Sequence, residues 1–224
     1  MSLRVLFLSA FVFLIPTAHA LAAGWCTSVQ SPHIRVKTDT DNIQYDFSKS
    51  EKDLNHFSID TVNPYGDNMI TDVGGLMQGR INVNQRMKYG TLTNTKTSEI
   101  CYWYTEITVS LHISPTIFVA KEFPKGSCKH KAILDHEHQH VVIDREIVNK
   151  YAKIIGDSLY SEVSARGVFG PVPLSKSGQL EDQLKKRMES LLTQYSEKIN
   201  EERRIRQQAL DSLSEYERVN KACQ

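Results

Sequence analysis

Five consecutive residues, His136-Glu137-His138-Gln139-His140, contain the pattern H-E-x-x-H. Side chains four positions apart lie on one face of a helix, so the imidazoles of His136 and His140 could hold one metal ion. Zinc suits imidazole ligands and needs no redox chemistry. Glu137 would lie beside the metal and could accept a proton from water whose pKa the metal lowers to about 7. We therefore expect Zn2+ as cofactor, His136 and His140 as ligands, and Glu137 as the general base of a hydrolase.

The sequence around this motif predicts a helix over residues 129 to 165. The two histidines lie on its apolar stripe, together with Ile133, Ile143, Ile147, Tyr151 and Ile154. A buried imidazole needs a polar partner, and a metal ion is one such partner. Three alternatives remain open: core histidines bonded to the backbone, a strand with an H-x-H-x-H metal site, and a zinc-binding fold without catalysis.

The third metal ligand is not evident from spacing, because no histidine follows His140. If the helix over 129–165 packs antiparallel to a second helix from residue 178, positions 136–140 face positions near 200–206. Glu202 lies on the apolar stripe in that window, and a carboxylate there needs a cation. We predict Glu202 as the third ligand. The other candidates are Glu162, Glu201, Asp211 and Glu215, with His112 and His130 from the strand side.

Other polar residues are candidates for supporting roles. Asp144 follows His140 by four residues and could reach back to its ring as a second-shell partner, or form a surface salt bridge. Tyr151, Tyr104 and His138 are candidates for stabilising a transition state. The strand predicted from Tyr102 to Ile113 could pair with an extended peptide substrate.

The first twenty residues have the features of a signal peptide. Arg4 supplies a positive charge, residues 5–15 are apolar, and Ala18-His19-Ala20 forms an A-x-A cleavage site. The apolar run is shorter than the ~20 residues of a membrane span, although an uncleaved anchor remains an alternative. We expect cleavage after Ala20, a periplasmic or secreted bacterial protein, and no membrane span afterwards.

The four cysteines of the chain are Cys26, Cys101, Cys128 and Cys223. An even number in an exported chain favours two disulfides. Of the three pairings, Cys101–Cys128 with Cys26–Cys223 is favoured, because this nested pattern ties both chain ends together. A zinc site of four cysteines is the alternative, but it lacks close C-x-x-C spacing.

Charge and length restrict the classes of partner. The 224 residues carry 27 Lys and Arg against 26 Asp and Glu, so the formal net charge is +1. This balance gives no reason to expect a nucleic-acid partner. We expect a peptide or protein substrate. A further partner could bind along the charged C-terminal helix.

The fold class expected is α+β, with an antiparallel sheet followed by the H-E-x-x-H helix and a long C-terminal helix, as in zincins. Residues 21–126 form the β-rich part, with strands at 33–37, 43–47, 79–89, 102–113 and 116–120. In the strand over 102–113, Trp103, Thr105 and Ile107 should share one face, opposite Tyr104 and Glu106. Residues 127–170 hold the active-site helix and a loop. Residues 171–224 hold one long helix, or two in line.

Several segments resemble a bacterial family of uncharacterised secreted proteins that are predicted to be zinc-dependent proteases. The segments are Cys101-Tyr102-Trp103-Tyr104, residues 115–123, Cys128, residues 132–141, residues 210–216 and Cys223. The resemblance would cover most of the mature chain and implies His136 and His140 as ligands and Glu137 as base. Family members often carry a Tyr-Asp and His-Gly pattern near the tail, and this chain lacks that histidine.

Overall fold

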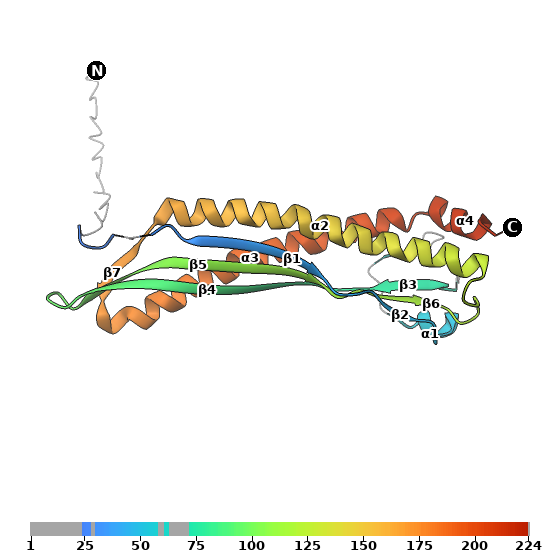
Figure 1. Ribbon diagram of the computed structural model, residues 1–224, viewed down its shortest axis with the longest axis horizontal. Helices are drawn as coiled ribbons and strands as arrows, with labels where there is room; N and C mark the ends of the chain where they lie inside the picture. Colours follow the sequence, from blue (N-terminus) through green and yellow to red (C-terminus); the bar gives the residue numbers. More distant parts are fainter. Residues whose placement is uncertain (1–23, 28–29, 58–60, 63–71, 224) are drawn as a thin grey trace, which may run out of the picture.

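The computed structural model describes residues 24–27, 30–57, 61–62 and 72–223. The expected signal peptide, residues 1–20, lies outside the described residues. The protein is an elongated mixed α/β structure, in which sheets from the N-terminal half lie against long helices from the C-terminal half (Figure 1).

The larger sheet has the strand order β1 (His33–Thr40), β5 (Glu99–Ile113), β4 (Ile81–Asn94), and β7 (Phe169–Pro173) also pairs with β5. A smaller sheet has the order β2 (Gln44–Asp46), β6 (Thr116–Val119), β3 (Gly75–Gln78). Strands β1 and β2 run parallel to β5 and β6, whereas the remaining pairs are antiparallel. The expected purely antiparallel sheet is therefore wrong. Strand β7 lies in the segment that was expected to be a loop.

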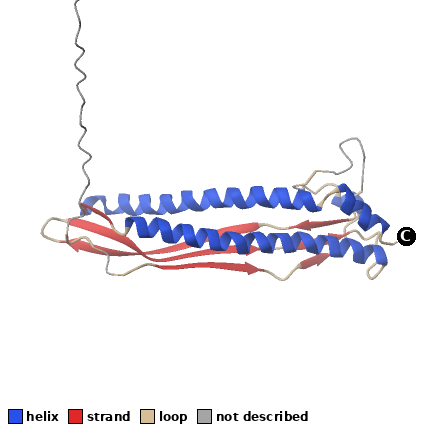
Figure 2. Ribbon diagram, turned by 90° about the horizontal axis from the view of Figure 1, so that it is seen from above, coloured by secondary structure: helices blue, strands red, loops and turns tan. Residues whose placement is uncertain are grey.

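Two long helices cover one face of the larger sheet. Helix α2 (Cys128–Arg166) and helix α3 (Ser177–Leu210) are joined through β7 and a 3-10 turn (Leu174–Lys176), and they lie side by side against the strands (Figure 2). Helix α4 (Leu213–Lys221) follows α3, and a short α1 (Glu51–Leu54) precedes β3. Among the described residues, no helix is both long enough and apolar enough to cross a membrane.

A break separates α3 from α4, so the C-terminal segment is two helices. The Ser212 side chain accepts a hydrogen bond from the backbone N–H of Glu215 and begins α4. Asp211 is left at the end of α3, where its backbone N–H donates to the Gln207 carbonyl.

The main core lies between β5 and the two long helices. Ile107, Val109, Leu111 and Ile113 are fully buried on one face of β5, as the alternating pattern predicts. A bulge then shifts the pattern, because Lys88 pairs with Glu106 while Tyr89 pairs with Tyr104. Beyond it, Tyr104 is buried and Trp103 turns to the other face. The expected grouping of Trp103 and Thr105 with Ile107 is wrong for this reason.

Helix α2 buries most of the predicted stripe, including His136, His140 and Ile147. Toward the C-terminal end of α2, the buried position is one residue later than predicted, because Ile154 is exposed and Ile155 is buried. The predicted steps average less than the 3.6 residues of a helical turn, so the stripe drifts around the helix.

The structure contains two disulfides, Cys26–Cys101 and Cys128–Cys223. Two bridges are present as expected, but the favoured pairing is wrong. Helix α4 returns to the first turn of α2 and places Cys223 beside Cys128, with 5.7 Å between their Cα atoms. Cys101 in β5 instead faces Cys26 near the start of the described chain. The bridges are compatible with an oxidising compartment.

Candidate metal site

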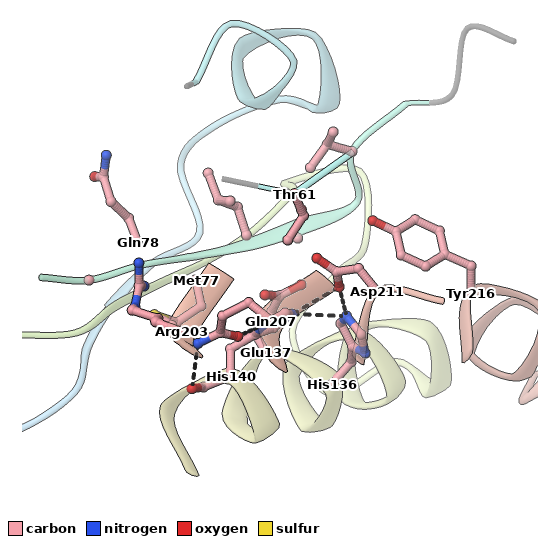
Figure 3. Close-up of a pocket in the computed structure, with 14 residues that line it drawn as sticks. Thr61, Met77, Gln78, His136, Glu137, His140, Arg203, Gln207, Asp211 and Tyr216 are labelled. Carbon is pink, nitrogen blue, oxygen red and sulfur yellow. Dashed lines mark hydrogen bonds and ion pairs between the residues drawn. The ribbon is translucent and has the colours of Figure 1, made fainter. Parts of the chain in front are cut away.

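Three buried side chains from two distant segments converge at the small-sheet end of the molecule (Figure 3). His136 and His140 lie one turn apart on α2, and Asp211 lies at the break between α3 and α4. Asp211 Oδ1 is 3.1 Å from His136 Nε2 and 3.0 Å from His140 Nε2, and the two Nε2 atoms are 3.3 Å apart. These three atoms form a nearly equilateral triangle that could hold a metal ion.

A second set of residues orients the imidazoles. Glu215 Oε1 lies 3.2 Å from His136 Nδ1, and Gln207 Oε1 accepts a hydrogen bond from His140 Nδ1. Because both oxygens act only as acceptors, each Nδ1 carries a proton and each Nε2 faces Asp211. The Gln207 amide nitrogen also donates to the His140 carbonyl at 3.1 Å, which fixes the glutamine against α2.

Asp144 supports the site indirectly. Its carboxylate is fully buried and does not contact the His140 ring; Oδ1 instead accepts from Gln207 Nε2 and from Arg203 Nε, both at 2.8 Å. The two expected roles, second-shell partner of His140 and surface salt bridge, are therefore replaced by a buried ion pair with Arg203. Asp144 reaches His140 only through Gln207.

The charges of the cluster stabilise one another. Burial disfavours the charged forms of both imidazoles, but hydrogen bonds to Asp211 and the negative charge of Glu137 outweigh it, so the pKa of His140 rises to about 9 and that of His136 also rises. Burial likewise opposes ionisation of Asp211, yet bonds from His136, His140 and Thr61 hold its pKa well below the ordinary value. The two imidazoles and the carboxylate therefore form a buried hydrogen-bonded network.

Glu137 lies beside the triangle on the face of α2 that packs on β3. Its carboxylate is buried, and burial raises its pKa to about 6 despite the nearby imidazoles and a hydrogen bond from the Met77 backbone. Helix and strand approach closely here because Gly75 has no side chain: a Cβ atom at this position would lie 2.3 Å from Ile133 Cγ2 and 3.0 Å from Glu137 Oε1.

A pocket of about 100 Å³ opens beside the triangle. It is lined by His136, Glu137, His140, Asp211, Gln207, Arg203, Tyr216, Thr61, Val73 and residues 75–79. The Tyr216 hydroxyl is turned toward this pocket from α4, and the Tyr216 ring lies 6.1 Å from that of His136 (Figure 3).

The predicted third ligand, Glu202, does not reach the site. Its carboxylate pairs with Lys150 Nζ at 2.6 Å on the flank of the two helices. Glu162 pairs with Arg187 and Glu201 pairs with Arg204. The assumed register of the two helices was wrong by about one helical turn, because His136 lies opposite Asp211. His140 therefore lies opposite Gln207 rather than residues 200–206.

The remaining candidates are also accounted for. His130 bonds to the Phe123 carbonyl, and His138 contacts the Tyr45 hydroxyl at 2.9 Å. The hydroxyls of Tyr104 and Tyr151 donate to backbone carbonyls of α3, away from the pocket. None of these four residues lines it.

His112 lies in a second group that could hold a metal ion, with Asp39 and Asp41. Its Nδ1 faces Asp39 at 3.3 Å and its Nε2 faces Asp41 at 3.0 Å. A metal ion takes one ring nitrogen, so this exposed cluster is better described as a histidine held between two carboxylates.

Strand β5 cannot accept a substrate strand where it was expected to, because β1 and β4 occupy both of its edges there. The strand beside the pocket is β3, whose only partner among the described strands is β6.

The sequence analysis did not predict Gln207, Arg203 and Tyr216 as residues of the site. A local signal existed for this region: Ser212 and Glu215 have S-x-x-E spacing, which indicates a new helix start and hence a break at Asp211.

Comparison with known proteins finds no matching family model, no matching characterised protein and no matching solved structure.

Proposed function

We propose that this protein is an exported zinc-dependent hydrolase, most simply a metallopeptidase of zincin type. The observation that carries the proposal is the triangle of His136 Nε2, His140 Nε2 and Asp211 Oδ1, with the buried Glu137 carboxylate beside it and a pocket in front. Asp211 takes the place of Glu202 as third ligand.

The donor triangle fits zinc in size and chemistry. Tetrahedral ligands about 2.0–2.1 Å from zinc lie roughly 3.3 Å from one another, and the three separations observed here are 3.0, 3.1 and 3.3 Å. Two imidazoles and one carboxylate are also a donor set of catalytic zinc sites, which keep the fourth position for water or substrate. The Nδ1 partners Gln207 and Glu215 match the outer hydrogen bonds that such ligands need.

Zinc, when bound, would polarise the substrate carbonyl and acidify water. Glu137 is next to that position and has no competing ion pair with any residue that the structure describes, so its carboxylate would accept the proton from water and pass it to the leaving amine. The Tyr216 hydroxyl lies across the pocket and would donate a hydrogen bond to the oxyanion as it develops.

The outer edge of β3 supports a peptide substrate. Residues 75–79 line the pocket, and an extended peptide could add to β3 as the next strand, with its carbonyl beside Glu137. The pocket of about 100 Å³ has room for little more than one small side chain or the scissile group. The rest of the substrate would lie along the strand.

A non-catalytic envelope protein is the second candidate. The favouring observation is that all four imidazole nitrogens of His136 and His140 already have carboxylate or amide partners. Such a network could stabilise the junction of α2, α3 and α4 without chemistry. The long helix α3 would then serve partner binding.

Metal analysis and a Glu137→Gln variant separate the two functions. For the enzyme we expect one zinc per chain in both proteins, and a loss of about a thousandfold in hydrolysis of a quenched-peptide library by the variant. Glu202→Gln, a glutamate outside the pocket, serves as the control and should keep full activity. Zinc without hydrolysis in the wild-type protein supports the structural role, and absence of stoichiometric metal contradicts the zinc site.

A further inference from the structure

The face of the larger sheet opposite α2 and α3 is here called the open face. Its side chains on β1 and β4 are exposed over residues 33–39 and 82–88, whereas at the far end the disulfide partner Cys26 covers Cys101. The side chains of the open face come in rows across β1, β5 and β4. One row is Arg35, Thr108 and Arg86, and the next is Lys37, Ser110 and Asn84. The β1 and β4 members are exposed, and the β5 hydroxyls lie half-buried between them.

The cations of the open face are not neutralised by its few acids. Glu106 pairs with Lys88 at 2.8 Å, and Asp39 and Asp41 both pair with His112. Arg35, Lys37 and Arg86 have no carboxylate partner among the residues that the structure describes. Strands lie about 4.8 Å apart, so the basic side chains of β1 and β4 form two columns about 10 Å apart with the hydroxyls of β5 between them.

An aromatic ring lies at one end of these columns. The bulge in β5 turns Trp103 onto the open face, where it covers Gly90 of β4: a Cβ atom at Gly90 would lie 2.3 Å from the indole ring. Trp103 remains partly exposed. The glycine therefore lets the indole lie flat on the sheet as a platform for stacking.

We propose that the open face binds an acidic polysaccharide, lying along β5 with its carboxylates or sulfates against Arg35, Lys37 and Arg86. Hydroxyl and amide side chains between the cations suit sugar hydroxyls, and Trp103 suits the apolar face of a sugar ring. An anionic membrane is disfavoured because the two basic rows carry no large apolar side chain for insertion, and Trp103 and the exposed Leu92 lie beyond the bulge. A nucleic acid is disfavoured because several stacking aromatics would be expected on a single-strand binding surface. The proposal does not depend on hydrolase activity.

Titration of the mature protein with heparin and with polygalacturonate at low salt tests this inference. Neutral dextran serves as the uncharged probe. We expect saturable binding of at least one acidic polymer, weakened by salt, and a change in tryptophan fluorescence that Trp103→Phe removes. Replacing Arg35, Lys37 and Arg86 together by serine should weaken binding about tenfold, since each exposed ion pair contributes a few-fold at low salt.

The charge-matched control replaces three exposed lysines of the helices, Lys153, Lys185 and Lys186, by serine. Equal weakening by both triple variants would show that overall charge attracts the polymer, and would overturn the assignment to the open face. Binding of a single-stranded oligonucleotide or of phosphatidylglycerol vesicles with higher affinity than either polysaccharide would also overturn it. All six positions are exposed on the surface, so both variants should fold, and circular dichroism checks this.

Discussion

Asp211 Oδ1 lies 3.0 Å from His140 Nε2, although His140 lies within α2 and Asp211 lies at the break that follows α3. This contact distinguishes Asp211 from the other carboxylates proposed as metal ligands. Asp211→Ala should therefore lower zinc affinity by at least about 100-fold, because it removes one of three protein donors. Competition with a chromophoric chelator measures this affinity.

Glu202→Ala is the matched control for this prediction, since Glu202 pairs with Lys150 on the helix flank. It should leave zinc affinity unchanged. If Glu202→Ala released the metal and Asp211→Ala did not, the ligand set proposed here would be wrong.

Gln207 should act as a positioning residue for His140. Its amide oxygen accepts from His140 Nδ1, and its amide nitrogen links to the buried Asp144. Gln207→Ala should weaken zinc binding by about 10- to 100-fold, the range for partners that orient a metal-binding histidine. The neighbouring Gln208 contacts Val62 instead, so Gln208→Ala should retain wild-type affinity. Equal effects of both changes would point to general loosening of α3.

The sequence allowed helix α2 and its two buried histidines to be predicted, because H-E-x-x-H and its apolar flanks have helical spacing over the whole segment. It did not allow Asp211 to be preferred over Glu202 among the candidate ligands, because the position of Asp211 depends on the register between α3 and α2. That register depends on where α3 starts after β7 and the 3-10 turn, and the new helix start at Ser212 leaves Asp211 at the end of α3. The same limit applies to Trp103, which one extra residue in β5 moves to the opposite face of the sheet.

The cluster of basic side chains on the open face could not be predicted from the sequence either. Arg35 and Arg86 are distant in the chain. They lie in one row of the sheet, on either side of Thr108, because β1 and β4 both pair with β5 at this residue. The balanced net charge of +1 describes the whole chain and says nothing of this pairing.

Tyr216 should contribute to the chemical step rather than to metal binding. Its hydroxyl faces the pocket, whereas its ring lies 6.1 Å from that of His136. Tyr216→Phe keeps the ring and removes the hydroxyl, so we expect zinc affinity to stay the same and kcat to fall by about 10- to 1000-fold with little change in KM. Steady-state kinetics on a cleaved peptide measure both constants. A rise in KM alone would assign Tyr216 to substrate binding.

The two disulfides should differ in their effect on the site, although their effect on stability should be similar. They close loops of 75 and 95 residues, so loss of either should cost about 4 kcal/mol of unfolding free energy in the chain-entropy picture. Only Cys128–Cys223 ties α4, which carries Glu215 and Tyr216, to the first turn of α2. Replacing this pair by alanine should lower zinc affinity and kcat, whereas replacing Cys26 and Cys101 should lower stability alone. Denaturant unfolding, chelator competition and peptide hydrolysis on the two double variants test this, and equal loss of zinc affinity in both would show that α4 is not held at the site by its bridge.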